Sequence, residues 1–168
     1  MPKIITNKQP NSHMCFVCGL KNKFGLKARF FEIEEKELVG IFDPADEHQG
    51  YPGRLHGGIA STILDETIGR AVLIEHKDSW WVTAELSVRF KKPVPIDGPI
   101  KVVGRITGSR GRIFEGTGEI LLADGTAAVT ATAKYFAQPI GDIVENEDFA
   151  DEMWEVVPES TDPLSIEI

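Results

Sequence analysis

The sequence predicts an α+β fold in which an antiparallel sheet of about six strands wraps around one long central helix. Apolar residues recur at the helical period in a single long stretch, residues 59–75. Two strand patterns precede this stretch and four follow it. One helix can cover an antiparallel sheet of this size only if the sheet curls around it, so these observations together predict a wrapped sheet.

The first half of the chain supplies two strands and the helix. Residues 26–33 and 38–42 have strand patterns on either side of the polar turn 34–37. The loop 43–55 is rich in glycine and proline, which are typical of turns. No proline interrupts the helical stretch, whose apolar stripe consists of Ala60, Ile63, Leu64, Ile68, Ala71 and Ile74.

The second half supplies four strands. Apolar and polar residues alternate without a fault over 82–90, and prolines 93 and 95 end that strand. Residues 100–106, 112–122 and 126–136 follow, and the Asp-Gly pair between the last two is a strong hairpin signal. This order of elements is that of the hotdog architecture. Its sheet leaves an edge open, so we expect a homodimer or homotetramer that covers the edge.

Charge is unevenly distributed along the 168 residues, whose net charge is −8. Residues 138–168 contain ten acids and no lysine or arginine, which leaves 16 acids and 18 bases in residues 1–137. We therefore expect a folded domain over 1–137 and a solvated acidic extension over 138–168. A nearly neutral body without a basic run argues against a nucleic-acid partner.

Segments that would direct the chain to a membrane are not found in the sequence. No stretch approaches the roughly 20 apolar residues of a membrane span. The first 15 residues lack the apolar core of a signal peptide. The sequence therefore predicts a cytoplasmic protein without a membrane partner.

Cys15 and Cys18 form a Cys-x-x-Cys pair near the start of the chain. A four-ligand zinc site needs a second such pair or suitably spaced histidines, and only His13 is near. A redox pair normally follows a strand and opens a helix, whereas Gly19 and Gly25 here indicate a turn. We expect a structural, partly buried cysteine pair, with no metal site and no cofactor. A metal shared across a dimer interface is the remaining alternative.

The start of the predicted helix carries residues suited to chemistry. His56, Gly57 and Gly58 come where the first N–H groups of a helix have no intrahelical partner and its dipole is positive. Such donors can stabilise the oxyanion that forms when a carbonyl is attacked, and glycines let a substrate approach the backbone closely. The alternative is that the two glycines serve only a tight turn.

Asp65 lies on the flank of this helix, roughly 120° from the centre of the apolar stripe. A carboxylate at the border of the core can face a cleft or a subunit interface. It could attack a carbonyl directly or act as a general base on water. The alternative is an exposed helix acid, and Glu66, on the opposite flank, is a candidate for that role.

This pattern resembles the hotdog thioesterases related to the phenylacetic-acid-pathway and THEM types. Members share a His-Gly-Gly at the start of the central helix and an aspartate seven residues after the second glycine, which match 56–58 and Asp65. Segments 15–26, 83–93 and 125–133 also resemble the family, so the likeness covers roughly residues 13–137. It implies an acyl-CoA thioesterase with an oxyanion hole at Gly57 and Gly58, and with Asp65 as nucleophile or general base.

The resemblance implies roles for further side chains. Gln49 is the nearest amide in the loop where some relatives have asparagine, and Thr83 matches a serine or threonine that assists the carboxylate in some relatives. The alternative for Thr83 is a β-branched strand residue on the outer face of the sheet. His56 is expected to organise the loop. In the family, the Gly-Gly site of one subunit faces the aspartate of its partner. CoA carries phosphates, so basic residues near a pocket mouth are candidates for binding it: Arg89, Lys91, Lys92, Arg110 and Arg112.

Two other functions are compatible with the same fold. A hydratase or dehydratase acting on 3-hydroxyacyl thioesters would pair His48 or His56 with Glu66. A non-enzymatic acyl-CoA-binding protein would use the fold without catalysis. The spacing between the His-Gly-Gly and Asp65 favours the thioesterase. A Ser-His-Asp hydrolase is disfavoured because the sequence has no Gly-x-Ser-x-Gly elbow.

Overall fold

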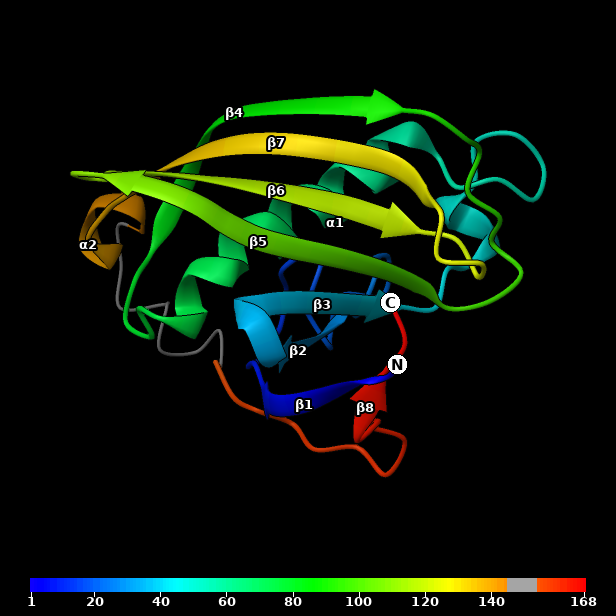
Figure 1. Cartoon of the computed structure of the whole chain (residues 1–168), viewed down its shortest axis with the longest axis horizontal. Helices are drawn as coiled ribbons and strands as arrows, with labels where there is room; N and C mark the ends of the chain where they lie inside the picture. Colours follow the sequence, from blue (N-terminus) through cyan, green and yellow to red (C-terminus); the bar gives the residue numbers. More distant parts are fainter. Residues whose placement is uncertain (145–153) are drawn as a thin grey trace.

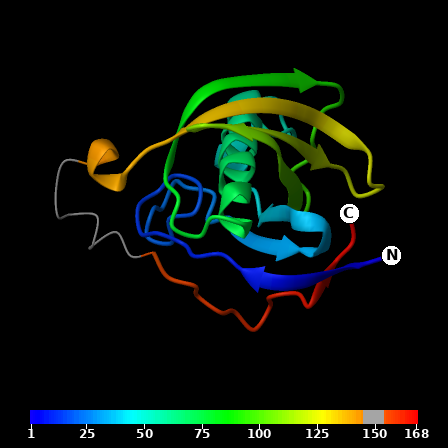
Figure 2. The ribbon, with the colours of Figure 1, turned by 60° about the vertical axis from the view of Figure 1, so that its left-hand side comes forward.

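A single curved antiparallel sheet wraps around one long helix in the computed structural model, which describes residues 1–144 and 154–168 (Figure 1). The helix α1 spans Gly57–Arg70, and the 3-10 turn η3 continues it over Ala71–Ile74. Figure 2 shows α1 enclosed by strands on more than one side. The predicted hotdog fold is confirmed, and the predicted helix 59–75 corresponds to α1 together with η3.

Within the residues that the structure describes, the sheet has eight strands in the order β4-β7-β6-β5-β3-β2-β1-β8, and all neighbouring strands are antiparallel. Among the described residues, no helix is long and apolar enough to cross a membrane. The strands are β1 Lys3–Lys8, β2 Arg29–Ile33, β3 Glu37–Phe42, β4 Trp81–Phe90, β5 Ile100–Arg110, β6 Ile113–Leu121, β7 Ala127–Ala137 and β8 Ser165–Ile166. The short elements are η1 Glu34–Lys36, η2 Asp46–His48 and α2 Ile140–Ile143.

The expectation of about six strands was wrong, because β1 and β8 extend the sheet beyond β2. β8 pairs with β1 through Lys3↔Ile166 and Ile4↔Ser165. Ile166 is only 4% exposed, so this part of the predicted acidic extension packs against the body and is not solvated. β8 has only two residues, too few to show an alternation of apolar and polar residues, and β1 has only two apolar residues among six. Neither strand can therefore be recognised from its sequence pattern. Both strands depend on pairing between distant parts of the chain.

The helix lies directly on the backbone of β5 and β6. A Cβ atom at Gly104 of β5 would lie 2.7 Å from the Thr67 carbonyl oxygen, and one at Gly116 of β6 would lie 2.5 Å from the Ile68 side chain. Neither distance is compatible with a side chain. These glycines therefore set how closely α1 approaches the sheet, and the buried face of α1 fills the core.

β4 is an edge strand of the sheet and pairs only with β7 in the described part of the chain. It is ten residues long, and its last residue, Phe90, is 55% exposed. A long open edge is a template for pairing with another chain.

Candidate active site

Asp65 lies half-buried on α1, at the border of the core. The Thr83 hydroxyl of β4 donates to its carboxylate, with Oγ1 2.9 Å from Oδ1 and 3.1 Å from Oδ2. Burial raises the pKa of Asp65 above its ordinary value, whereas the hydrogen bond from Thr83 acts to lower it. The carboxylate is therefore held in place and is more basic than that of an exposed aspartate, which suits a general base or a nucleophile.

A β-bulge in β4 turns Thr83 toward Asp65. The pairing of β4 with β7 skips Ala84, which lies between Thr83 and Glu85. An extra residue in one strand reverses which side chains face the two sides of the sheet. Thr83 therefore faces α1 before the bulge, as Leu86 does after it. The strict alternation predicted over 82–90 was wrong at this point.

Tyr135 of β7 is a second contact to Asp65 that the sequence did not reveal. Its hydroxyl donates to the Asp65 backbone oxygen at 2.8 Å, and its ring stacks on Phe114 with centroids 5.2 Å apart. Burial raises the pKa of Tyr135, so its hydroxyl stays protonated as a donor. Tyr135 thus fixes this turn of α1 to the sheet. A tyrosine within an apolar strand is the only signal in the sequence, and it does not indicate a partner.

The His56 side chain caps the N-terminus of α1. Its Nδ1 accepts a hydrogen bond from the Gly58 N–H at 2.9 Å. The Gly58 N–H is therefore occupied within this chain, whereas the Gly57 N–H has no acceptor among the described residues. Gly57 is exposed, and a Cβ there would lie 3.5 Å from the Phe90 ring. Of the two predicted oxyanion donors, Gly57 is the one open to a ligand.

Gln49 and His48 shape the loop that leads into α1. The Gln49 side-chain oxygen accepts from the Gly53 N–H at 2.9 Å. His48 is buried, and its Nδ1 accepts from the Ala45 N–H at 3.0 Å. Both side chains therefore bind the backbone of the loop itself. Gln49 thus supports the backbone of the loop that runs directly into His56.

Lys91 and Lys92 lie next to the open start of the helix. They follow β4 and line a shallow pocket of about 310 Å³ together with Gly57 and Phe90. Arg89, two residues before Lys91, is exposed and lines a neighbouring surface pocket with it. Three of the five predicted basic residues therefore gather at this end of β4.

Arg110 and Arg112 lie at the other end of β4. They flank the turn between β5 and β6, and the Arg112 side chain donates to the Ala137 carbonyl at 3.2 Å. Ala137 pairs with Trp81, the first residue of β4. The length of β4 separates the two groups of bases by roughly 30 Å. A single chain does not bring Arg110 and Arg112 to the pocket beside Gly57.

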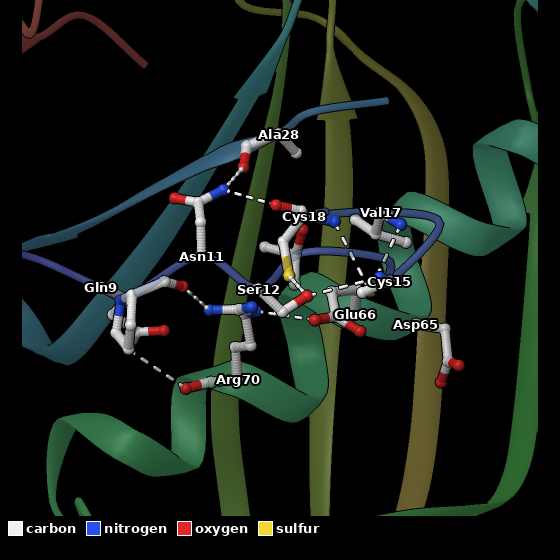
Figure 3. Close-up of polar contacts among 12 residues, drawn as sticks. Gln9, Asn11, Ser12, Cys15, Val17, Cys18, Ala28, Asp65, Glu66 and Arg70 are labelled. Atoms are coloured by element: carbon white, nitrogen blue, oxygen red, sulfur yellow. Dashed lines mark hydrogen bonds and ion pairs between the residues drawn. The ribbon is translucent and has the colours of Figure 1, made fainter. Parts of the chain in front are cut away.

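Glu66 and Asp65 leave α1 in different directions (Figure 3). Glu66 Oε1 accepts from Arg70 Nε at 2.7 Å, in an ion pair beside the N-terminal loop. The histidines that a hydratase would pair with Glu66 are engaged elsewhere, because the rings of His48 and His56 bind loop and helix N–H groups. The geometry therefore gives no support to the hydratase alternative.

The family follows from comparison with known proteins. Residues 52–129, which include α1, β4 and β5, match the model of the thioesterase superfamily. This stretch also contains Gly57, Asp65 and Thr83. Residues 52–129 therefore match the thioesterase superfamily, and the resemblance predicted from the sequence is confirmed.

Particular relatives share this domain. The chain is 28% identical over 112 residues to acyl-coenzyme A thioesterase THEM4 of Bos taurus, covering 66% of this chain and 45% of that protein. It therefore spans less than half the length of this relative. The crystal structure of a thioesterase superfamily protein superposes with a TM-score of 0.67 at 28% identity, covering 75% and 60% of the two chains. A Bacillus halodurans protein solved with CoA gives a TM-score of 0.58 at 22% identity, covering 66% and 73%.

Proposed function

We infer that this chain hydrolyses acyl-CoA thioesters to a free acid and CoA. The observation that carries this proposal is the half-buried carboxylate of Asp65, held by Thr83 on the central helix of a thioesterase superfamily domain. The acyl-CoA thioesterase relative and the structural neighbour solved with CoA support this substrate class. Lys91 and Lys92 beside Gly57 are then the first candidates to meet the CoA phosphates.

One chain alone cannot bring the reacting groups together. Asp65 follows Gly57 by eight residues, which is about 12 Å along an α-helix. A carboxylate and an oxyanion donor that act on the same carbonyl must both lie within about 3 Å of it. Each active site is therefore built from two chains. Pairing of two β4 edges into a homodimer, or a dimer of such dimers, brings the start of one α1 toward Asp65 of the other chain.

In the proposed reaction, the thioester carbonyl oxygen accepts a hydrogen bond from the Gly57 N–H of one subunit. Asp65 of the other subunit attacks the carbonyl carbon, or removes a proton from a water molecule that attacks it. The N–H group and the positive end of the helix stabilise the oxyanion. The C–S bond then breaks, and the CoA thiolate leaves and is protonated. After direct attack by Asp65, water hydrolyses the acyl–aspartyl anhydride and restores the carboxylate.

Hydrolysis of a panel of short, long and aromatic acyl-CoAs tests the activity, with released thiol as the readout. We expect turnover by the wild type and a loss of about 10²-fold or more in Asp65→Asn, because the general base or nucleophile is missing. Crotonyl-CoA and 3-hydroxyacyl-CoA are included to detect hydration or dehydration. Wild-type turnover by Asp65→Asn contradicts the mechanism, and hydration without hydrolysis contradicts the function.

Mixing of inactive subunits tests the shared site. Asp65→Ala and Gly57→Val chains are co-expressed with different tags, and the heterodimer is purified through both tags. Each heterodimer contains one site with an intact Gly57 and an intact Asp65, so its activity should reach about half that of the wild-type dimer. If both groups came from the same chain, the heterodimer would stay inactive. A fully active monomer by light scattering also contradicts the shared site.

A further inference from the structure

Cys15 and Cys18 of the N-terminal loop lie against Glu66 of α1, whereas Asp65 points elsewhere (Figure 3). Both cysteines are free thiols; Cys18 is fully buried and Cys15 half-buried. One sulfur from each cysteine and one Glu66 carboxylate oxygen lie within 4.8 Å of one another. We propose that these three side chains bind a divalent cation of the zinc type, at a site separate from the candidate active site.

The spacing of the three ligand atoms is close to that around a tetrahedral ion. Zinc lies about 2.3 Å from sulfur and about 2.0–2.2 Å from oxygen, so its neighbouring ligand atoms are about 3.5–3.8 Å apart. The three atoms here therefore need to close by about 1.0–1.3 Å at most, which side-chain rotation can supply. Two sulfurs select a soft cation such as zinc over magnesium or calcium. The half-exposed Cys15 leaves a route for the ion to enter and for water to take the fourth position.

The cysteine loop is fixed by hydrogen bonds before any ion arrives. The Cys15 sulfur accepts from the N–H groups of Val17 at 3.4 Å and Cys18 at 3.5 Å. The buried Asn11 side chain donates to the Cys18 carbonyl at 2.8 Å. A Cβ at Gly19 would lie 2.3 Å from the Cys15 carbonyl oxygen, so only glycine fits after the second cysteine. These contacts fix the positions of the two sulfur atoms before an ion binds.

Charge balance at the cluster also favours a divalent cation. Two thiolates and one carboxylate carry three negative charges, and Arg70 supplies one positive charge through its ion pair with Glu66. A divalent cation makes the whole set neutral, as a buried set of charges requires. Arg70 is fully buried, and its guanidinium lies 4.4 Å from the Phe30 ring centroid and 4.6 Å from that of Trp154. It thus orients the Glu66 carboxylate as the outer partner of a metal ligand does.

Cobalt titration of the reduced, untagged full chain tests the site. We expect one Co²⁺ per chain, a thiolate-to-cobalt charge-transfer band in the near ultraviolet, and strong visible bands of tetrahedral Co²⁺ that zinc abolishes. Zinc should also raise the melting temperature of the reduced wild type, because an ion that binds only the folded state stabilises it. Neither effect should occur in Cys15→Ser or Cys18→Ser.

Two matched carboxylate variants assign the third ligand. Glu66→Gln should keep the fold, because its amide oxygen can still accept from Arg70, but it should weaken zinc binding at least about tenfold. Glu75→Gln is the control, because Glu75 follows η3, is exposed and pairs with Lys36 away from the cluster. Asp65→Asn should bind zinc as the wild type does. Failure of the metal proposal can therefore be distinguished from failure of the proposed hydrolysis.

Three results would overturn the site. The first is a reduced wild type that takes up neither Co²⁺ nor Zn²⁺ with defined stoichiometry. The second is binding that persists unchanged in both cysteine variants, which would place the ion elsewhere. The third is equal zinc affinity in wild type and Glu66→Gln, which would remove the carboxylate from the ligand set.

Discussion

The Thr83 hydroxyl reaches both carboxylate oxygens of Asp65 because Ala84 is an extra residue in β4. Without this bulge, Thr83 would lie on the outer face of the sheet, and the candidate catalytic carboxylate would have no side-chain donor from β4. A local irregularity in one strand thus connects an edge of the sheet to the central helix. The position and the pKa of the Asp65 carboxylate both depend on this contact.

Replacement of Thr83 by valine keeps the shape of the side chain and removes the hydroxyl. Because that hydrogen bond lowers the pKa of Asp65, its loss should raise this pKa further. The acid limb of the pH profile of kcat/KM should then move to higher pH. At neutral pH we expect kcat/KM to fall about tenfold, which corresponds to about 1.4 kcal/mol. Thr83→Ser should retain the wild-type profile, and overlapping profiles for valine and wild type would contradict the role of the hydroxyl.

The stability of the fold should respond to Asp65 in a pH-dependent way. Its folded-state pKa is raised, so its contribution to stability is present while it is protonated and is lost as pH rises through that pKa. At neutral pH the ionised, half-buried carboxylate costs stability. Asp65→Asn should therefore melt at or above the wild-type temperature at neutral pH, with a smaller difference in acid. Thermal unfolding at several pH values measures this, and Asp78→Asn is an exposed control.

The role of the Gly57 N–H in catalysis can be tested without disturbing the fold. An alanine Cβ there would meet the Phe90 ring at 3.5 Å, an ordinary contact, but its methyl group would crowd the approach to the N–H. We expect kcat of Gly57→Ala to fall by about 10²-fold, as for loss of an oxyanion donor, with an unchanged melting temperature. Steady-state kinetics and thermal unfolding check both. Wild-type kcat in this variant would exclude the Gly57 N–H from the reaction.

Because α1 lies close to β5, alanine variants at two glycines of β5 should differ in stability. Gly104→Ala places a methyl group against backbone atoms of Thr67, which cannot move without shifting the helix. We expect a loss of about 1–3 kcal/mol in the free energy of unfolding, as for overpacked cores. Gly108→Ala is the control, because a Cβ there meets nothing within 4 Å. Chemical denaturation of both variants decides the point, and equal stabilities would refute it.

The sequence was sufficient to predict the central helix and six strands, because each has its own period of apolar residues. It was also sufficient for Asp65 at the border of the core. The bulge in β4 was missed because Ala84 is apolar and preserves the alternation of its neighbours. The amino-acid composition of β4 does not show that Ala84 lacks a pairing partner in β7. The contact between Thr83 and Asp65 was predicted by resemblance alone. The alternation of apolar and polar residues in β4 placed Thr83 on the outer face of the sheet instead.

The cluster around Cys15 was missed for a different reason. The prediction of no metal site counted cysteines and histidines near Cys15 and Cys18 in the sequence. The third potential ligand, Glu66, comes from α1, 48 residues after Cys18, and only the packing of the loop on the helix brings it close. Residues that meet through tertiary packing cannot be recognised from local spacing. Tyr135, which reaches Asp65 from 70 residues away, was missed for the same reason.

The pairing of β1 with β8 has a consequence for the order of folding. It joins Lys3 to Ile166, so it closes a loop of more than 160 residues, whereas β4 to β7 pair over far shorter separations. Contacts this distant form late, because the entropy of a long loop must be lost first. During synthesis β1 emerges before β8 and lacks its outer neighbour until β8 is made. Its free edge could then pair with other chains, and the charges of Lys3 and Lys8 at its two ends discourage that aggregation.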